Sequence, residues 1–398
     1  NICYTFFNII YLFDMKINIY GSTGEIGNNT LKIILKNFNE YKINLLVAKS
    51  NVKKILYQVK KYKPKFVYLD DELSNQELNF QIKKNKYNTK VLQKKNMKLE
   101  LSKRYINASI FSISGLDSLK YLNLIIGKTK YLGFVNKESI VSAGHLFTKM
   151  NKNQYTKIFP LDSEHFSLLN FFDNNNSNQI KKIYLTASGG PFLNTPIKQL
   201  KKATFTKAKN HPKWKMGYKN SIDSATLSNK CLELIEAHYL FNIPKKKLDV
   251  IIHPEALIHS IIELKNNTSI FNYFTNDMSI PVSNFLNFCL NNKYDIYKKN
   301  NFYNINLNFL PVDKKKFPIY SFFFNHIKND TFKIIKFNLA NQFAVELFKN
   351  GKISYTEISQ IIKKSLQIKL YCNINSLKDI ILFNKTYFDK LDEKFNNN

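Results

Sequence analysis

A glycine-rich turn close to the start of the chain constrains the fold more than any other stretch. The run KINIY predicts a short strand, GSTGEIG follows it directly, and NNTLKIILKNF predicts a helix. Gly21, Gly24 and Gly27 permit a tight turn that leaves backbone N–H groups at a helix N-terminus, where they can bind a pyrophosphate. Their spacing, GxxGxxG, differs from the usual GxGxxG, so a purely structural turn is the alternative. The order strand, glycine turn, helix favours a dinucleotide-binding domain.

The strand and helix signals continue to alternate after this turn. INLLVA, KFVYLD and NASIFSIS predict strands, KILYQVKKY and GLDSLKYLNLIIGKTK predict helices, and YLGFVNKESIVSAGHLF predicts a strand that runs into a helix. Only the polar section from Asp71 to about Lys103 interrupts the alternation, and it predicts a loose connection. The pattern predicts an α/β fold with a parallel, Rossmann-like sheet.

The residues after the second predicted strand indicate which dinucleotide is bound. A site selective for NAD usually has an acid there, which holds the ribose 2′-hydroxyl. This chain instead has Lys49, Ser50 and Asn51, which offer a cation, a hydroxyl and an amide. These groups favour the 2′-phosphate of NADP.

Further polar groups follow later strands, at the edge where α/β sheets bind ligands. Asn136, Lys137 and Glu138 stand at a strand–helix junction, where an ordinary capping turn is the alternative. The strand in KKIYLTASGGPF ends at Ser188 in a turn that suits an anion.

Two carboxylates in the segment PLDSEH form a candidate metal site. Asp162 and Glu164 flank Ser163 between apolar runs, and on an extended segment residues i and i+2 point to the same side. Carboxylate oxygens of this kind suit Mg²⁺ or Mn²⁺. A helix cap is the alternative for the same pair.

The stretch from residue 211 to residue 236 is denser in polar and ionisable groups than any other. Ser221 and Asp223 are good N-cap residues, so a helix is expected to start near Ser224. Asn229, Glu233 and Glu236 then fall on one helix face, beside Lys230. A solvated face with Lys230 paired to Glu233 is the alternative to a polar site.

The segment before this helix combines a ring, a thioether and a glycine in a short basic loop. His211, Trp214, Met216 and Gly217 are the residues concerned. Such a loop suits a lid that closes over a polar ligand.

Length and composition bound the class of protein. With 398 residues and 44% hydrophobic content, the chain can form two or three domains. The net charge of +31 raises a nucleic-acid-binding protein as a rival class. The lysines are spread along the chain, however, as expected from an AT-rich genome, so we expect neither nucleic acid nor membrane as partner.

The four cysteines lie far apart, which indicates a reducing compartment and no zinc site or disulfide framework. We expect Met15 to be the true start, with residues 1–14 an upstream or non-native extension.

Toward the C-terminus the sequence carries helical periodicity and no further polar site. His253 and His259 lie in an apolar run and are expected to be packing histidines rather than metal ligands. From Asp330 onward two long segments predict a small helical bundle, and the tail from Lys390 is expected to fray.

Seven motifs occur along the chain in the order GSTGEIG, VNKES, PLDSEH, TASGGPF, HPKWKMG, DSATLSNKCLELIEA and IIHPEALIHS. Together they resemble the 1-deoxy-D-xylulose 5-phosphate reductoisomerase family of the non-mevalonate isoprenoid pathway. The resemblance runs from about Lys16 to Pro281 and continues weakly into NLANQFAVELF. Seven ordered motifs make it highly specific. A semialdehyde or homoserine dehydrogenase, the closest rival enzyme, needs no trio of metal ligands.

The resemblance implies an NADPH-binding domain over residues 15–160 and an α+β catalytic domain over 161–290, with a lid loop near 209–218. A linker over 291–312 and a C-terminal helical domain over 313–398 complete the chain, which would form a homodimer. The implied reaction rearranges 1-deoxy-D-xylulose 5-phosphate by retro-aldol and aldol steps and reduces the product with NADPH to 2-C-methyl-D-erythritol 4-phosphate. The expected location is the bacterial cytoplasm, with a plastid-type organelle as the alternative.

The family's functional positions carry over residue by residue. The implied NADPH contacts are Thr23, Gly24, Glu25, Ile26, Asn51, Asn136, Glu138 and Gly217. The implied ligands of one Mg²⁺ or Mn²⁺ ion per subunit are Asp162, Glu164 and Glu233. The implied substrate contacts are Lys137, Ser163, Glu164, Ser188, His211, Ser224, Asn229, Lys230 and Glu233, with Ser188, Ser224, Asn229 and Lys230 toward the phosphate. Lys137 and the three metal ligands are the implied catalytic residues, and Trp214 and Met216 form the implied lid.

Three motifs depart from the family pattern, and the loop after Asp162 is shorter than usual. KSN replaces the usual GKN at residues 49–51, and Gln342 replaces the acid of NAANE. Glu25 replaces a small serine and puts a negative charge near the pyrophosphate, which is expected to weaken cofactor binding unless the side chain turns away.

Overall fold

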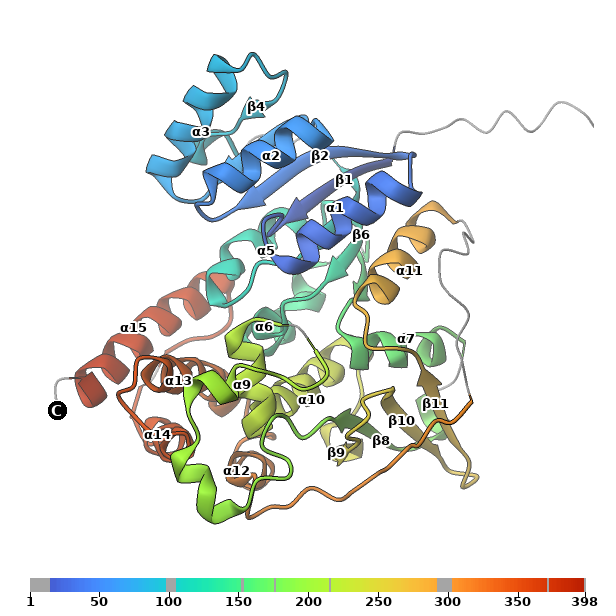
Figure 1. Ribbon diagram of the computed structural model, residues 1–398, viewed down its shortest axis with the longest axis vertical. Helices are drawn as coiled ribbons and strands as arrows, with labels where there is room; N and C mark the ends of the chain where they lie inside the picture. Colours follow the sequence, from blue (N-terminus) through green and yellow to red (C-terminus); the bar gives the residue numbers. More distant parts are fainter. Residues whose placement is uncertain are drawn as a thin grey trace, which may run out of the picture.

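The computed structural model describes residues 15–97, 105–151, 154–174, 177–214, 216–291, 303–370 and 372–396. Residues 1–14, the end of the 71–103 section and residues 292–302 of the 291–312 linker lie outside these ranges. Figure 1 shows the N-terminal α/β unit at the top, a second sheet at the lower right and the C-terminal helices at the lower left.

Seven parallel strands form the first sheet, in the order β4-β3-β2-β1-β5-β6-β7. Their bounds are β1 Met15–Tyr20, β2 Tyr41–Ala48, β3 Phe66–Leu69, β4 Lys90–Val91, β5 Ile106–Phe111, β6 Thr129–Phe134 and β7 Lys157–Pro160. The connecting helices are α1 Glu25–Asn37, α2 Val52–Tyr62, α3 Glu72–Lys84, α5 Leu119–Ile125 and α6 Lys137–Met150. The strand order reverses between β1 and β5, so the crevice at the carboxyl ends of these two strands is the expected ligand site. The predicted Rossmann-like sheet is confirmed.

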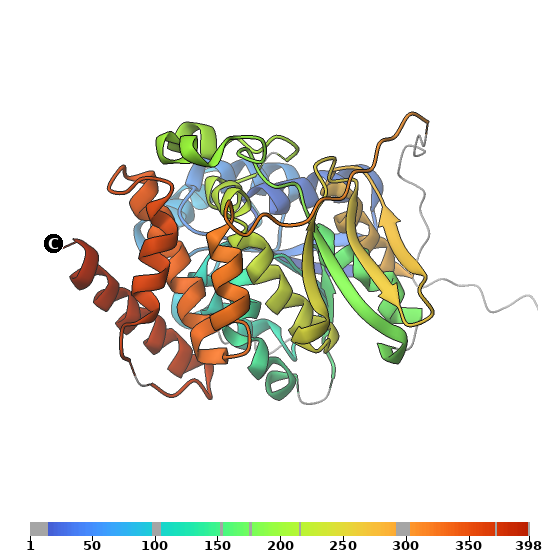
Figure 2. The ribbon, with the colours of Figure 1, turned by 90° about the horizontal axis from the view of Figure 1, so that it is seen from below.

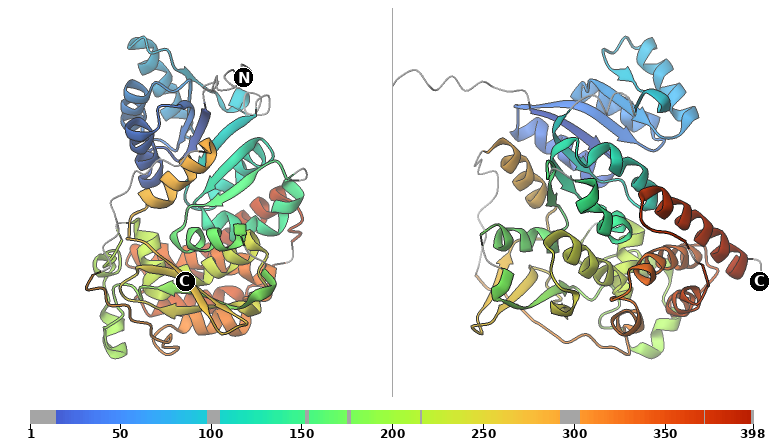
Figure 3. Two further views of the ribbon diagram at one scale, coloured as in Figure 1. Left: turned by 90° about the vertical axis from the view of Figure 1, so that its right-hand side faces the viewer. Right: turned by 180° about the vertical axis from the view of Figure 1, so that it is seen from behind.

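Both faces of this sheet are covered by helices. Successive side chains of β1 point to opposite faces and therefore enter different cores. Ile19 belongs to the core under α1, whereas Tyr20 belongs to the core under α5 and α6. Helix α11 (Ser279–Leu290) returns from much later in the chain, and its Val282 and Phe285 are fully buried in the first of these cores (Figure 3).

The prediction of a loose connection from residue 71 is wrong. Helix α3 starts directly after Asp71, whose carboxylate accepts a hydrogen bond from Ser74 N at 2.9 Å. Its buried Leu78 and Ile82 are four residues apart, so they lie on one face. Leu73 and Phe80 of the same helix are exposed, so its apolar residues do not form one continuous face and the helical periodicity is weak.

The second sheet is mixed, with the order β11-β10-β8-β9, and stands beside the C-terminal helices (Figure 2). Its strands are β8 Ile180–Ala187, β9 Leu248–Ile252, β10 Ile258–Leu264 and β11 Ser269–Tyr273. The remaining long helices are α7 Ser163–Asn174, α9 Tyr218–Thr226, α10 Ser228–Phe241, α12 Pro318–His326, α13 Thr331–Lys349, α14 Glu357–Leu366 and α15 Leu377–Asn396; α8 is the short Phe205–Ala208. The expected fraying from Lys390 is wrong for the described residues, because α15 continues to Asn396 and buries Leu391.

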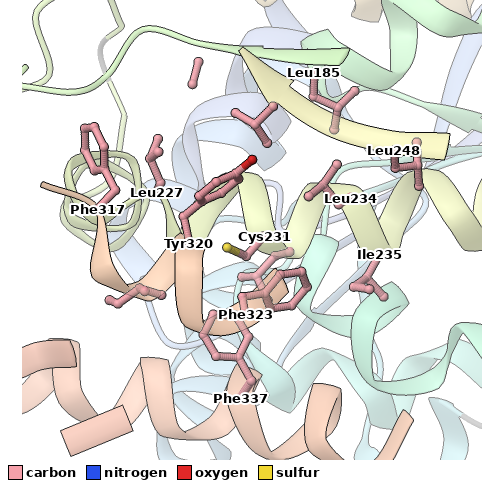
Figure 4. Close-up of a cluster of buried hydrophobic side chains, with 14 of the residues drawn as sticks. Leu185, Leu227, Cys231, Leu234, Ile235, Leu248, Phe317, Tyr320, Phe323 and Phe337 are labelled. Atoms are coloured by element: carbon pink, nitrogen blue, oxygen red, sulfur yellow. The ribbon is translucent and has the colours of Figure 1, made fainter. Parts of the chain in front are cut away.

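Helix α10 lies at the centre of the molecule and joins the second sheet to the C-terminal helices. In Figure 4, Cys231, Leu234 and Ile235 of α10 lie between Leu185 and Leu248 of the sheet and aromatic side chains of α12 and α13. Burying a large apolar side chain contributes about 1.5–3 kcal/mol each. This packing fixes α10, and the polar side chains on its opposite face are fixed with it. Among the described residues, no helix is both long and apolar enough to cross a membrane.

Candidate active site

A cavity of about 1020 Å³ opens where the carboxyl ends of β1, β5, β6 and β7 meet the end of β8. It brings together eighteen of the twenty predicted site residues, and only Thr23 and Asn51 do not line it. The Thr23 carbonyl accepts a hydrogen bond from Lys54 Nζ at 2.5 Å, and the Asn51 side chain caps α2. Lys49, two residues before Asn51, does line the cavity.

The glycine turn forms one wall of this cavity. Gly21 has a φ of +90°, and a Cβ there would lie 2.7 Å from the Ser112 backbone, so glycine is required where β1 and β5 diverge. Helix α1 begins at Glu25, with Gly24 and Ile26 beside it on the cavity wall. The Glu25 side chain is exposed, so it is free to turn toward solvent.

Asn136 caps helix α6 and also lines the cavity, so the capping turn and the polar group at the strand end are both present. Its Oδ1 accepts a hydrogen bond from Ser139 N at 2.6 Å, which caps α6, while its Nδ2 donates to the carbonyl oxygens of Ile113 and Gly115. It therefore ties the loop after β5 to the start of α6. Lys137 and Glu138 follow it on the first turn of α6 and line the cavity.

Three carboxylates converge at the inner end of the cavity. One oxygen each from Asp162, Glu164 and Glu233 lie within 4.8 Å of one another. Glu164 is not on an extended segment, as the sequence analysis assumed, because α7 begins at Ser163 and places Glu164 in its first turn. The Glu164 N–H donates to Asp162 Oδ1 at 3.3 Å, so the cap and the cluster are both present.

Two lysines neutralise this cluster. Lys137 Nζ lies 2.9 Å from Asp162 Oδ2 and 2.7 Å from Glu233 Oε1. Lys230 Nζ pairs with Glu164 and lies 2.7 Å from Glu233 Oε2. The Lys230–Glu233 pair exists, but the solvated-face alternative is wrong, since the Glu233 side chain is only 1% exposed.

The pKa values of Glu164 and Asp162 are shifted in opposite directions. Burial and the nearby Glu233 raise the pKa of Glu164 to about 7. Burial alone would raise the pKa of Asp162 as well, but Lys137 and His165 hold it below its usual range. The raised pKa of Glu164 reflects burial and the crowding of three carboxylates, and a divalent cation bound among them would relieve this repulsion.

His165 and Glu236 stand behind the cluster. His165 Nε2 donates to the Glu233 carbonyl at 2.9 Å, and Nδ1 lies 3.3 Å from Asp162 Oδ1 and 3.5 Å from Glu236 Oε2. Burial would lower the pKa of His165, but Glu236 and Asp162 raise it to about 9. The sequence analysis missed His165, although its position three residues after Asp162 on a helix was a usable signal.

The expected helix start near Ser224 is wrong. Ser221 and Asp223 lie inside α9, whose N-cap is Gly217. The helix is interrupted at Leu227, which has a φ of 60° and separates α9 from α10. The break redirects the chain so that α10 presents Asn229, Lys230 and Glu233 to the cavity. Asn229 Oδ1 accepts from Lys137 Nζ at 2.9 Å, and its Nδ2 donates to Glu233. The local sequence does not predict that Leu227 adopts the left-handed backbone conformation.

His211 links the loop 209–218 to two hydroxyl groups. Its Nδ1 accepts hydrogen bonds from the Lys213 and Trp214 N–H groups at 3.2 and 3.0 Å. Nε2 must then carry the ring proton, and it lies 2.9 Å from Ser188 Oγ and 3.2 Å from Ser224 Oγ. Burial and Lys230 lower the pKa of His211 to about 4, so this ring is neutral at pH 7.

Close packing brings those two serines together. Gly190, at a φ of +67°, lies so near α9 that a Cβ would be 2.7 Å from Ala225 Cα. Ser224 therefore stands beside the turn that carries Ser188.

Trp214 is half-buried, and its ring centroid lies 6.0 Å from that of His259. His259 is buried and stacks on Phe274, as expected for a packing histidine.

The C-terminal helices supply a wall of the cavity that the sequence analysis missed. Residues from α13 and α15 that line it are Leu339, Gln342, Glu346, Ile381, Asn384, Lys385 and Phe388. Leu339, Gln342 and Glu346 lie in the segment NLANQFAVELF, whereas the residues from α15 belong to none of the motifs, and only tertiary packing brings both groups to the site. The loop after β5, residues 112–117, also lines the cavity and was not singled out.

A glycine turn at the switch point of a parallel sheet, with a carboxylate cluster in the same cavity, defines an oxidoreductase of the dinucleotide-binding class. The sequence models of known families identify the particular one. Residues 17–144 match 1-deoxy-D-xylulose 5-phosphate reductoisomerase, residues 158–241 match the C-terminal domain of this reductoisomerase, and residues 275–387 match a DXP reductoisomerase C-terminal domain. The chain belongs to the 1-deoxy-D-xylulose 5-phosphate reductoisomerase family, whose enzymes convert this sugar phosphate to 2-C-methyl-D-erythritol 4-phosphate.

Relatives and solved structures agree over nearly the whole chain. The reductoisomerase of Sulfurihydrogenibium sp. is 36% identical over 373 residues, which cover 92% of this chain and 94% of the relative. That of Pelagibacter ubique is 37% identical over 378 residues, covering 91% and 94%. A crystal structure of DOX-P reductoisomerase in complex with NADPH, fosmidomycin and magnesium has a TM-score of 0.86 at 30% identity, covering 96% of this chain and 98% of the other. The Zymomonas mobilis enzyme in complex with NADPH has a TM-score of 0.86 at 29% identity and the same coverage.

Proposed function

We propose that the cavity holds NADPH against the glycine turn and the sugar phosphate against the carboxylates, so that hydride passes directly between them. One observation carries this proposal: the turn at Gly24 and the cluster around Glu233 line the same cavity. The structurally similar enzyme with NADPH, fosmidomycin and magnesium supports it.

Asp162, Glu164 and Glu233 are the proposed ligands of one Mg²⁺ or Mn²⁺ ion. Their oxygens converge within 4.8 Å, and hard oxygen donors are what both ions prefer. When bound, such an ion polarises the hydroxyl and ketone oxygens of the substrate as a Lewis acid. His165 holds two of these ligand residues in place through its contacts with the Asp162 carboxylate and the Glu233 carbonyl.

Lys137 is the proposed electrostatic catalyst. Burial would lower its pKa, but Asp162 and Glu233 raise it well above the usual value, so Nζ stays protonated. A protonated ammonium in a buried site stabilises negative charge that develops on a substrate oxygen. Lys137 is therefore proposed to donate a hydrogen bond to that oxygen.

Ser188, Ser224 and the Nε2–H of His211 are proposed to bind the substrate phosphate. All three groups are hydrogen-bond donors, and they meet at the mouth of the cavity. Asn229 and Lys230, which the family resemblance assigns to the phosphate, instead contact Glu233 in this structure. Phosphate binding by these two residues would require their side chains to leave the carboxylate.

The test follows NADPH absorbance in the presence of 1-deoxy-D-xylulose 5-phosphate, with Mn²⁺, with Mg²⁺ and with a chelator. Oxidation of NADPH is expected only when substrate and metal are both present. Oxidation at the full rate in the presence of chelator would rule out the proposed metal dependence.

We also propose a homodimer, a domain division near residues 160, 290 and 312, and a location in the bacterial cytoplasm. The described part of β11 pairs only with β10 and exposes Ile270 by 41% and Phe271 by 50%, which suits a second copy at this edge. The two relatives named above come from bacteria, and a plastid-type organelle is the alternative location. Light scattering of Phe271→Lys tests the dimer: we expect the mass of a monomer, and an unchanged dimer mass would rule out this edge.

A further inference from the structure

Lys219 joins two carboxylates at the end of the loop 209–218. It lies in the first turn of α9, two residues after Gly217, and lines the cavity. Its Nζ lies 2.9 Å from Glu138 Oε1 and 2.6 Å from Asp223 Oδ2. The Lys219 side chain is 19% exposed and the two carboxylates are 7% and 1% exposed. Each of these charges would be costly to bury alone, so the three depend on one another.

Helix α13 contacts both acidic residues, one through its carboxylate and the other through its backbone. The second oxygen of Asp223, Oδ1, accepts a hydrogen bond from Asn341 Nδ2 at 2.8 Å. The backbone carbonyl of Glu138 accepts from Asn338 Nδ2 at 3.0 Å. Asn338 and Asn341 lie three residues apart, on one face of α13. Lys219 is therefore fixed between α6 and α9 with α13 behind both.

The position of Glu138 gives this arrangement its importance for the reaction. Glu138 directly follows Lys137 in the first turn of α6, and Lys137 contacts the carboxylate cluster. A movement of Lys219 would shift the turn that aims Lys137. Lys219 thus connects the end of the loop that carries Trp214 to the ammonium at the reacting end of the cavity.

A cation in the first turn of α9 is opposed by the helix dipole and by burial. Burial would lower the pKa of Lys219, but Asp223 and Glu138 raise it. The chain therefore retains a lysine where local helix electrostatics disfavour one. A lysine there is explained by the two carboxylates that it bridges.

We propose that Lys219 is a positioning residue, whose two ion pairs fix the end of the loop 209–218 relative to Lys137 so that the loop closes over the substrate in one register. Glu138 then acts through Lys219 rather than by contacting the dinucleotide. The inference rests on the lid role of Trp214 and Met216.

The test compares Lys219→Met, which removes the charge, with Lys219→Arg, which can still bridge two carboxylates. Lys181→Met is the control, because Lys181 forms an exposed pair with Glu263 at 2.6 Å, outside the cavity. We expect Lys219→Met to lower kcat and raise KM for the sugar phosphate, with a loss of about tenfold or more in kcat/KM. Lys219→Arg should recover most of it, and Lys181→Met should match the unaltered protein.

A second readout follows the loop itself. Trypsin cleavage after Lys213 is measured by mass spectrometry, with and without Mg²⁺, NADP⁺ and the sugar phosphate, since NADP⁺ prevents turnover. The ligands should protect this bond in the unaltered protein and in Lys219→Arg but not in Lys219→Met. A lower melting temperature with normal KM, kcat and protection would make Lys219 merely structural and overturn the proposal.

Two further variants make every outcome decisive. If Lys219→Met does not fold, Glu138→Gln takes its place, because it removes only the link to α6 and keeps the Asp223 pair. A rise in KM for NADPH alone in Glu138→Gln would make Glu138 a cofactor contact and overturn the proposal. Trp214→Ala is measured in parallel: if it changes kinetics but Lys219→Met does not, only the positioning role fails, and if neither does, the lid role fails.

Discussion

Replacing Glu233 by glutamine tests the metal site most directly. The carboxylate is 1% exposed, and its two oxygens each lie 2.7 Å from a lysine ammonium, one from Lys137 and one from Lys230. Glutamine keeps the shape and the helix propensity but removes the charge and one acceptor oxygen. A salt bridge on the surface would be worth about 1 kcal/mol at most, and this burial excludes that case.

The apo protein should remain folded in the Glu233→Gln variant. Lys137 keeps Asp162 and Asn229 as partners, and Lys230 keeps Glu164. A hydrogen bond to a charged group contributes about 1.5–3 kcal/mol, but losing the repulsion between Glu233 and Glu164 offsets part of the loss. We therefore expect a fall of about 1–3 kcal/mol in the free energy of unfolding without metal.

The effect on metal binding and turnover should be larger. A hundredfold loss in kcat/KM corresponds to about 2.7 kcal/mol of transition-state stabilisation. Mn²⁺ at a hundred times its Kd stabilises the native state by about 2.7 kcal/mol, and a hundredfold weaker Kd reduces this to about 0.4 kcal/mol. Excess Mn²⁺ should restore part of the turnover.

The assay combines thermal unfolding with and without Mn²⁺ and NADPH-dependent turnover over a range of Mn²⁺ concentrations. Glu263→Gln is the matched control, since Glu263 pairs with Lys181 on the surface. Normal turnover with the same Mn²⁺-induced rise in melting temperature would refute a metal role for Glu233.

Three more predictions follow from named contacts. NADPH should be used well ahead of NADH, and Lys49→Ala should raise KM for NADPH about threefold to tenfold with little effect on NADH; equal kcat/KM for the two cofactors would contradict this. Trp214→Ala should raise KM and lower kcat with an unchanged melting temperature, because the half-buried ring lines the cavity rather than packing in a core and is the proposed lid; unchanged kinetics would count against a lid. His211, whose pKa is about 4, binds fewer protons in the native than in the unfolded state between pH 4 and 6.5, so its contribution to stability is lost as pH falls through this window. Urea unfolding at pH 7, 5.5 and 4 should therefore show a smaller acid-induced loss in His211→Gln than in the unaltered protein, and equal losses would argue against the lowered pKa.

The sequence by itself determined the class of fold and eighteen of the residues that line the cavity. A strand, glycine turn and helix followed by further alternation predicts a parallel sheet with a tight turn at its edge, and Gly21 tolerates both the positive φ and the close approach of the Ser112 backbone there. Motifs at strand ends, such as Asn136 and Asp162, converge for the same topological reason: parallel strands end at one edge. Short local patterns therefore carried information about a site assembled from distant segments.

Only the tertiary structure decided how these residues are paired. Asp162 precedes α7, Glu233 lies on α10, and the lysine between them, Lys137, comes from α6. The break at Leu227 turns α10 toward the cavity, and neither its backbone angle nor the burial of Glu233 can be read from local residue preferences, because packing of α10 against the second sheet and the C-terminal helices imposes both. Ionisation followed from that packing as well, since a carboxylate takes its pKa from burial and neighbouring charges, which only the folded chain brings within a few ångströms.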